Sequence, residues 1–205
     1  MPSHFALDDS EALGLLSSLD TGHLISVHGG VPHASLLPMH VRVSPDHPVR
    51  IIAHFARGNP HWRHITSGDT VLFVATGPDA YVSPGYYPSK AETGRVVPTW
   101  NYVEVQARGV IRLLDDEGEL LAIVHELTDH FEAGRDEPWS VDDAPSEFIA
   151  AQLRAIVGVE ITVTEITGKA KLSQNRPDAD RIGARDGLRG AGGSGAAVAA
   201  LMGGD

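Results

Sequence analysis

Tyr102–Leu113, which has the sequence YVEVQARGVIRL, is the stretch that decides the fold. Apolar residues alternate through it with charged or amide side chains, which is the period-two pattern of a strand with one buried face. The apolar face consists of Val103, Val105, Ala107, Ile111 and Leu113. The opposite face consists of Glu104, Gln106, Arg108 and Arg112. The sequence therefore predicts one long strand here, which needs partner strands elsewhere in the chain.

Short segments with strand character lie on both sides of it. They cover residues 23–28, 34–43, 49–55, 71–75 and 159–166. Gly29-Gly30 predicts a turn between the first two. Pro38 lies inside 34–43, so that strand is expected at an edge, or open at that point to something other than another strand. The proline- and glycine-containing residues 77–101 predict a long irregular loop, and loops of this length are usually functional.

Helical patterns are fewer and mostly come late. Asp8 and Glu11 form a capping-box pair that begins a helix over 8–19. A short helix is predicted from Pro60, and longer ones at about 117–133, 145–156 and 178–189. Closely spaced strands with late helices favour a mainly β fold with added helices over a βαβ sheet. We expect one domain over 1–189, with helical additions at about 115–157 and 178–189, and a flexible Gly/Ala-rich tail over 190–205.

Composition and charge limit the function classes. The 205 residues contain no cysteine, which excludes disulfides and thiolate chemistry. No signal-peptide pattern and no apolar run of about 18 residues is present, so we expect a soluble, cytoplasmic protein with no membrane partner. The net charge is -11. Residues 115–147 hold twelve acidic side chains and a single arginine, and this balance disfavours a broad DNA-binding surface.

The segment His54–Trp62 is the first that could carry chemistry. It leaves a strand and enters a helix, with Asn59 at the N-cap position and Pro60 at the first helical position. Unpaired backbone N–H groups at a helix start suit a phosphate, and Arg57 adds a cation that can bind two oxygens. An ordinary capped helix with a surface arginine explains the same residues, and the pattern alone does not decide between the two.

Two further segments have open interpretations. Four tyrosines and a tryptophan lie between Tyr81 and Tyr102, where they could contact a planar heteroaromatic ligand or form a small aromatic core. Residues 169–176 mix cations with side-chain amides that could reach a phosphate or a ring carbonyl, or could dock on the acidic stretch. The eleven histidines form no metal-ligand motif. His61 and His64 share one face of a short helix and could bind a metal, but we expect them to be solvated. We therefore predict no metal site, and no nucleophilic triad is evident.

Several segments, in order, resemble one family. They are Pro2–Phe5, Ser35–Pro38, His54–Trp62, Tyr81–Pro84, Tyr87–Lys90, Val97–Tyr102, Arg154–Gly158 and Lys171–Arg176. Together they resemble the PaiB-like FMN-binding negative transcriptional regulators, over roughly residues 1–189. One departure is Ser35, where the family often has threonine; the hydroxyl group is kept.

The resemblance implies a homodimeric FMN-binding split β-barrel with FMN at the subunit interface. The phosphate would lie near Arg57 and Asn59, and Ser35, Leu36, Leu37 and Pro38 would present backbone groups to the flavin ring. Lys90, Trp100, Gln174 and Asn175 would close the site, from the same or the other subunit. His54, Ala56 and Thr99 lie in the matched segments and complete the predicted cofactor-binding set.

The function implied is negative transcriptional regulation without an evident DNA-binding motif, so direct specific DNA binding is not expected. Two alternatives stay open. One is a flavin-dependent oxidoreductase or flavin reductase, because a fold does not determine its chemistry. The other is a haem-handling or flavin-storage split-barrel protein. The sequence assigns no catalytic residue.

Overall fold

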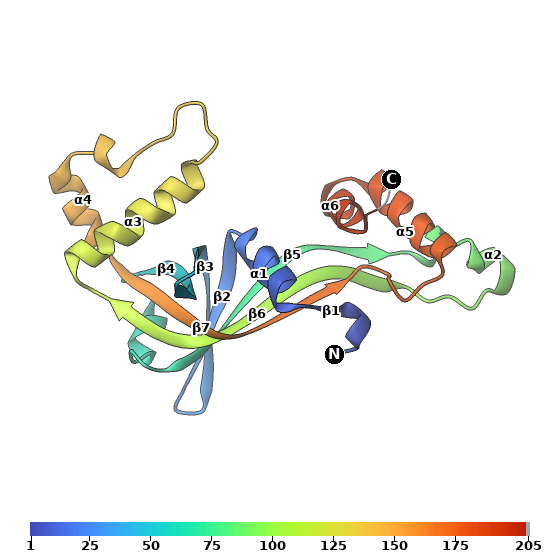
Figure 1. The fold of residues 1–205 in the computed structure, drawn as a ribbon, viewed down its shortest axis with the longest axis horizontal. Helices are drawn as coiled ribbons and strands as arrows, with labels where there is room; N and C mark the ends of the chain where they lie inside the picture. The colour runs from blue at the N-terminus through green and yellow to red at the C-terminus, as the bar shows by residue number, and fades with distance from the viewer. Residues whose placement is uncertain (204–205) are drawn as a thin grey trace. The chain divides into compact units, whose positions relative to one another are not determined.

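The computed structural model describes residues 1–203. Its strands are β1 Ala6–Leu7, β2 Thr21–His28, β3 Val31–Ser44, β4 His47–Ala56, β5 Thr70–Val82, β6 Thr99–Leu114 and β7 Ile156–Lys171 (Figure 1). The α-helices are α1 Asp9–Ser17, α2 Ser89–Thr93, α3 Glu117–Glu132, α4 Ser146–Leu153, α5 Asp178–Ala191 and α6 Gly193–Leu201. Short 3-10 helices are η1 Ser3–Phe5, η2 Pro60–His64, η3 Pro84–Tyr86 and η4 Val141–Asp143.

The strands form one sheet in the order β1-β7-β4-β3-β2-β5-β6. An additional pairing of β7 with β6 joins the two sides of this order, so the sheet closes on itself. The β2–β3, β3–β4 and β4–β7 pairs are antiparallel. The predicted strand at Tyr102–Leu113 is present within β6, and Val103, Val105, Ala107 and Ile111 on its apolar face are buried. The mainly β prediction with late helices is confirmed.

Two compact units make up the described chain, and the long strands run through both. Among the described residues, the first contains 1–15, 76–105 and 167–203, and the second contains 16–75 and 106–166. In the second unit, Ile52 and Leu114 of the sheet pack with Ile123 and Leu127 of α3. Arg42 of β3 also forms an ion pair with Glu126 of α3. Apolar packing and this ion pair together hold α3 against the strands that carry the candidate site.

The first unit corrects two predictions. Residues 77–82, predicted as irregular, continue β5 through Pro78. Residues 193–201, predicted to belong to a flexible tail, form α6, whose Val198 and Ala199 are buried against a cluster that includes Val82. The alanines favour helix, and packing gives the helix a reason to persist. The preceding Gly192 has φ 70°, which breaks α5 from α6. Residues 204–205 of the predicted tail lie outside the described residues.

A close approach of two strands depends on Gly109 of β6. A Cβ atom at this position would lie 2.4 Å from the backbone oxygen of Thr162 in β7 and 2.6 Å from the side chain of Ile161. Backbone cannot move aside as a flexible side chain can. The glycine is therefore a packing requirement of the β6–β7 pair.

Candidate functional site

Strands β3 and β4 separate at the segment that contains Pro38. Their pairing extends from Ser44↔His47 to Met39↔Ala53 and goes no further. Beyond it, β3 pairs with β2, as in Ser35↔Leu24, while β4 pairs with β7, as in His54↔Gly158. Within the described residues, 35–38 thus have no partner in β4. Proline cannot donate to a ladder, so its position fits the end of this pairing.

A chain of polar side chains lies beside this opening. Ser35 Oγ is 2.9 Å from His61 Nδ1, and Ser26 Oγ is 2.9 Å from His61 Nε2. Asn59 Nδ2 donates to Ser35 Oγ at 3.0 Å, while Asn59 Oδ1 accepts from the His61 backbone N–H at 3.0 Å. Asn59 therefore caps η2 as the sequence predicts, and also fixes the hydroxyl of Ser35.

The burial of His61 differs from the prediction. His61 was expected to be solvated, but it is buried, with 4% of its surface exposed. Burial lowers its pKa, and the nearby His33 and His64 lower the pKa further. His64 is partly exposed, and its ring stacks on that of His33 at 4.5 Å between centroids. A buried imidazole held between two hydroxyl groups is a fixed polar part of the site.

Arg57 is engaged by its own chain. Its Nε donates to Arg154 O at 2.9 Å, and its Nη2 donates to Ile156 O at 2.8 Å. Nη2 also forms an ion pair with Asp115. Arg57 further lines a cavity of about 350 Å³ whose charged walls include Asp115, Glu117 and Arg154. Arg57 and Asn59 share no hydrogen-bond partner, so a phosphate that contacts both would have to compete with Asp115 for Arg57.

The predicted ring-contacting residues differ in exposure. Leu36 is 58% exposed and Pro38 and Ala56 are also exposed, whereas Leu37 is buried with 4% of its surface exposed. An outward-facing leucine on a strand whose β4 side is open provides an apolar platform with a backbone edge beside it. His54 lies across the separation, and its Nδ1 has no hydrogen-bond partner.

The remaining predicted residues belong to the first compact unit. Lys171 Nζ donates to Thr99 Oγ1 at 2.5 Å and to Trp100 O at 2.7 Å. Trp100 is 52% exposed, and Gln174, Asn175 and Lys90 are exposed as well. Burial lowers the pKa of Lys171. Lys171 of segment 169–176 thus contacts Thr99 and Trp100 at the start of β6.

Both interpretations of the aromatic segment hold in part. Tyr87 is buried in the core of the first unit, and Tyr86 packs against that core. Tyr81 and Trp100 instead form an exposed edge-to-face pair with centroids 6.0 Å apart. Two of these aromatic residues therefore stabilise the unit, while two remain available to a ligand.

Sequence reasoning missed Ser26 and Asp115. Ser26 lies in a predicted strand without a motif around it, and Asp115 appeared only as one of many acidic residues. Their partners, His61 and Arg57, are far away in the sequence, so only the folded chain reveals these contacts. Among residues 1–203, no group of three or more potential ligands is arranged to hold a metal ion. No helix in that range is long and apolar enough to span a membrane.

Comparison with known proteins identifies the family. A family model described as "Putative FMN-binding domain" matches residues 1–165. The chain belongs to this FMN-binding family. It is 32% identical over 181 residues to the "Protease synthase and sporulation protein PAI 2" of Bacillus subtilis, covering 88% of this chain and 84% of that protein. The resemblance to PaiB-like proteins is confirmed, and FMN is the cofactor.

A fungal relative matches a smaller part. An uncharacterised protein of Emericella nidulans is 38% identical over 131 residues, which cover 58% of this chain and 52% of that protein. The chain thus spans about half the length of this relative.

Solved structures with this fold include flavin proteins. The "FAD and Heme binding protein from Mycobacterium smegmatis" has a TM-score of 0.56 at 18% identity, covering 87% of this chain and 75% of that one. The "Flavocytochrome Anf3 from Azotobacter vinelandii" has a TM-score of 0.58 at 14% identity, covering 87% and 74%. At these identities the likeness concerns the fold alone, and it confirms the predicted split β-barrel.

The residues of the opening fit a flavin ring. The β3 edge that has no β4 partner, the exposed Leu36 and the ordered Ser35 hydroxyl match a planar heterocycle with polar edges. The residues expected to hold the phosphate fit it less well, because the guanidinium of Arg57 is already paired with Asp115.

Proposed function

We propose that the protein is an FMN-dependent negative regulator of gene expression, which acts through a protein or small-molecule partner in the cytoplasm. Membership of the FMN-binding family and the sporulation-related name of the Bacillus subtilis relative support this role. The observation that carries the indirect mode of action is the state of helix α5, in which three aspartates balance three arginines. Arg181 and Arg185 donate to the backbone oxygens of Met202 and Gly203, and therefore are engaged within their own chain.

The proposed cofactor geometry uses both predicted sets. In the second unit, the flavin ring lies along residues 35–38, beside His54 and Ala56, and the phosphate is held by Arg57 and Asn59. Lys90, Thr99, Trp100, Gln174 and Asn175 close the site, from this copy or a second copy of the chain. Residues 1–189 act as one flavin-binding domain. When bound, FMN supplies one- and two-electron redox chemistry at its ring.

A genetic and biochemical experiment tests this role. Transcripts are compared between cells that lack the gene and cells complemented with the wild type or with Arg57→Ala. We expect a set of transcripts to rise on deletion, to fall with the wild type and to stay raised with the variant. His47→Phe, which alters an exposed residue away from the proposed cofactor contacts, is the control and should restore repression.

The same protein is assayed for NAD(P)H oxidation with FMN bound. Steady turnover of the nicotinamide, combined with transcripts that do not respond to deletion, would replace the regulatory role by a flavin-dependent oxidoreductase.

A further inference from the structure

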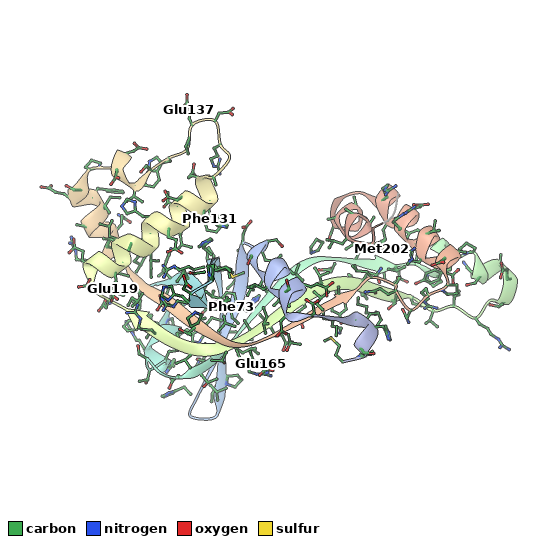
Figure 2. The ribbon with its side chains drawn as sticks, viewed as in Figure 1. Phe73, Glu119, Phe131, Glu137, Glu165 and Met202 are labelled. Atoms are coloured by element: carbon green, nitrogen blue, oxygen red, sulfur yellow. The ribbon has the colours of Figure 1, made fainter. Side chains whose placement is uncertain are left out.

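A second cavity lies between the end of β4 and α3, within the second compact unit. Its volume is about 320 Å³. It is lined by Pro38, His54, Val124, Leu127, Thr128, Phe131, Glu132 and Trp139. We call it the α3 cavity. Phe131 lies on the last turn of α3 (Figure 2). The cavity shares Pro38 and His54 with the opening proposed for the flavin ring, so an occupant would lie beside the cofactor.

The charge of the lining excludes the flavin phosphate from the α3 cavity. No lysine or arginine is among its lining residues, and the one acidic residue is Glu132. The Glu132 carboxylate accepts from the Trp139 backbone N–H at 3.1 Å and pairs with Arg135 at 3.1 Å. A phosphate dianion here would lose its hydration without gaining a cation. The cavity therefore suits a group without negative charge, and not the phosphate end of FMN.

His54 supplies one unmet polar contact. Its Nδ1 is buried and has no hydrogen-bond partner in the described chain. Burial lowers the pKa of His54, and a backbone hydrogen bond at Phe55 opposes this shift only in part, so the imidazole is neutral at neutral pH, with one ring nitrogen as donor and the other as acceptor. A hydroxyl group both donates and accepts, and it satisfies Nδ1 in either tautomer. An unpaired buried polar atom is costly, which makes this contact a selective one.

Two aromatic side chains, Phe131 and Trp139, form part of the apolar lining of the cavity. Phe131 is 37% exposed and Trp139 is 46% exposed, although both line a cavity with Leu127 and Val124. Aromatic rings pair through offset or edge-to-face contacts with other rings. A planar apolar ligand would cover these side chains, and its size is limited by the cavity to one or two rings.

We propose that the α3 cavity binds a neutral aromatic molecule that carries a hydroxyl group, with the hydroxyl on His54 Nδ1 and the ring against Phe131 and Trp139. Such a molecule is the small-molecule partner through which the regulator responds; this role rests on the proposed function, whereas the binding itself does not. No residue in the cavity is assigned a covalent step.

The binding is measured by equilibrium dialysis on the full chain loaded with FMN. Three probes of similar shape are used: 2-naphthol, 2-methylnaphthalene, which lacks the hydroxyl, and 2-naphthoate, which is anionic. We expect one equivalent of 2-naphthol to bind, and the other two to bind about fivefold to tenfold more weakly, the worth of one hydrogen bond. Prior incubation with 2-naphthol should leave the bound FMN in place.

Variants separate the two contacts. His54→Phe keeps a ring but removes Nδ1, so the preference for 2-naphthol over 2-methylnaphthalene should vanish. His47→Phe makes the same change at an exposed position of the same strand and should keep the preference. Trp139→Ala, which alters a partly exposed residue outside any helix or strand, should weaken both neutral probes. It provides a second test if His54→Phe does not fold.

The outcomes are distinguishable. Displacement of FMN by 2-naphthol would assign the cavity to the cofactor and overturn the proposal. Equal affinity for 2-naphthol and 2-methylnaphthalene in the wild type, or an unchanged preference in His54→Phe, would overturn it as well. Binding of 2-naphthol together with unresponsive transcripts would leave the cavity site in place and overturn only the regulatory role.

Discussion

Arg57 has two competing partners in the proposed site, the flavin phosphate and Asp115. Arg57→Ala should weaken FMN by about 1.5–3 kcal/mol, the usual worth of a hydrogen bond to a charged group, while riboflavin, which has no phosphate, loses little. Asp115→Asn should strengthen FMN, because the guanidinium is then released from its ion pair. Fluorescence titration of both flavins measures this. Equal losses for both ligands in Arg57→Ala would locate the phosphate elsewhere.

The buried His61 makes stability depend on pH. Its pKa in the folded protein is below the ordinary value of 6.5, so below that pH the unfolded chain binds a proton that the folded chain does not. The stabilisation that comes from this neutral imidazole should therefore be complete above about pH 6.5, and the free energy of unfolding should decrease as the pH falls toward the folded pKa. His40 and His54 have lowered pKa values as well and act in the same direction.

Urea unfolding at pH 7.5 and pH 5.5 measures this dependence. His61→Asn should be less stable than the wild type at pH 7.5 but should lose less stability between the two values. A pH dependence as steep in the variant as in the wild type would show that other groups carry the effect.

At the residue scale, the sequence predicted features that depend on neighbouring residues, and it missed contacts between residues that lie far apart in the sequence. The Asn59 cap was predictable because residue type and neighbours determine it. The burial of His61 and the pairing of Arg57 with Asp115 were not, because each depends on residues brought together by the sheet.

At the scale of elements, Gly109 tests how closely the paired strands β6 and β7 must approach each other. Gly109→Ala should lower the free energy of unfolding by about 1–3 kcal/mol, as overpacking against immobile backbone does. Gly14→Ala in α1, where nothing lies within 4 Å of the added Cβ, should instead stabilise by about 0.5–1 kcal/mol. Chemical denaturation of both variants provides the comparison. An unchanged free energy of unfolding in Gly109→Ala would mean that the two strands can move apart.

The elements themselves were largely predictable, and their lengths were not. Each predicted strand is present, because alternation is a strong local signal, but β5 and β7 extend beyond their predicted ends. Pairing with neighbours sustains β5 through Pro78. Likewise, α6 forms where glycine and alanine suggested flexibility, since its stability comes from packing that composition does not reveal.

At the scale of the whole molecule, we predict a homodimer. Val27, Val31 and Leu36 on β2 and β3 are 66%, 56% and 58% exposed, and apolar side chains at an open strand are commonly covered by a second copy. Light scattering at micromolar concentration with FMN should give twice the 21.8 kDa monomer mass. Val31→Asp should shift the population toward monomer, whereas Val110→Asp on β6 should not. A monomer mass for the FMN-loaded wild type would contradict the prediction.

We also predict no specific binding of duplex DNA by the protein alone. A net charge of -11 opposes phosphate contacts, which supply much of the affinity in such complexes. Fluorescence anisotropy with the upstream region of its own gene, at about 150 mM salt with and without FMN, should show no binding below micromolar concentration. A nanomolar, sequence-dependent signal would restore direct repression.

The separation of β3 from β4 has a consequence for the abundance of the protein in the cell. In the proposed site, a flavin seated against residues 35–38 would replace the strand that is missing there, and a ligand that binds only the folded chain adds to its stability by mass action. Scarcity of the vitamin from which flavins are made would then enlarge the unfolded fraction and, with it, the share removed by proteases. The cellular level of this protein would consequently follow the nutritional supply of riboflavin even without any change in its synthesis.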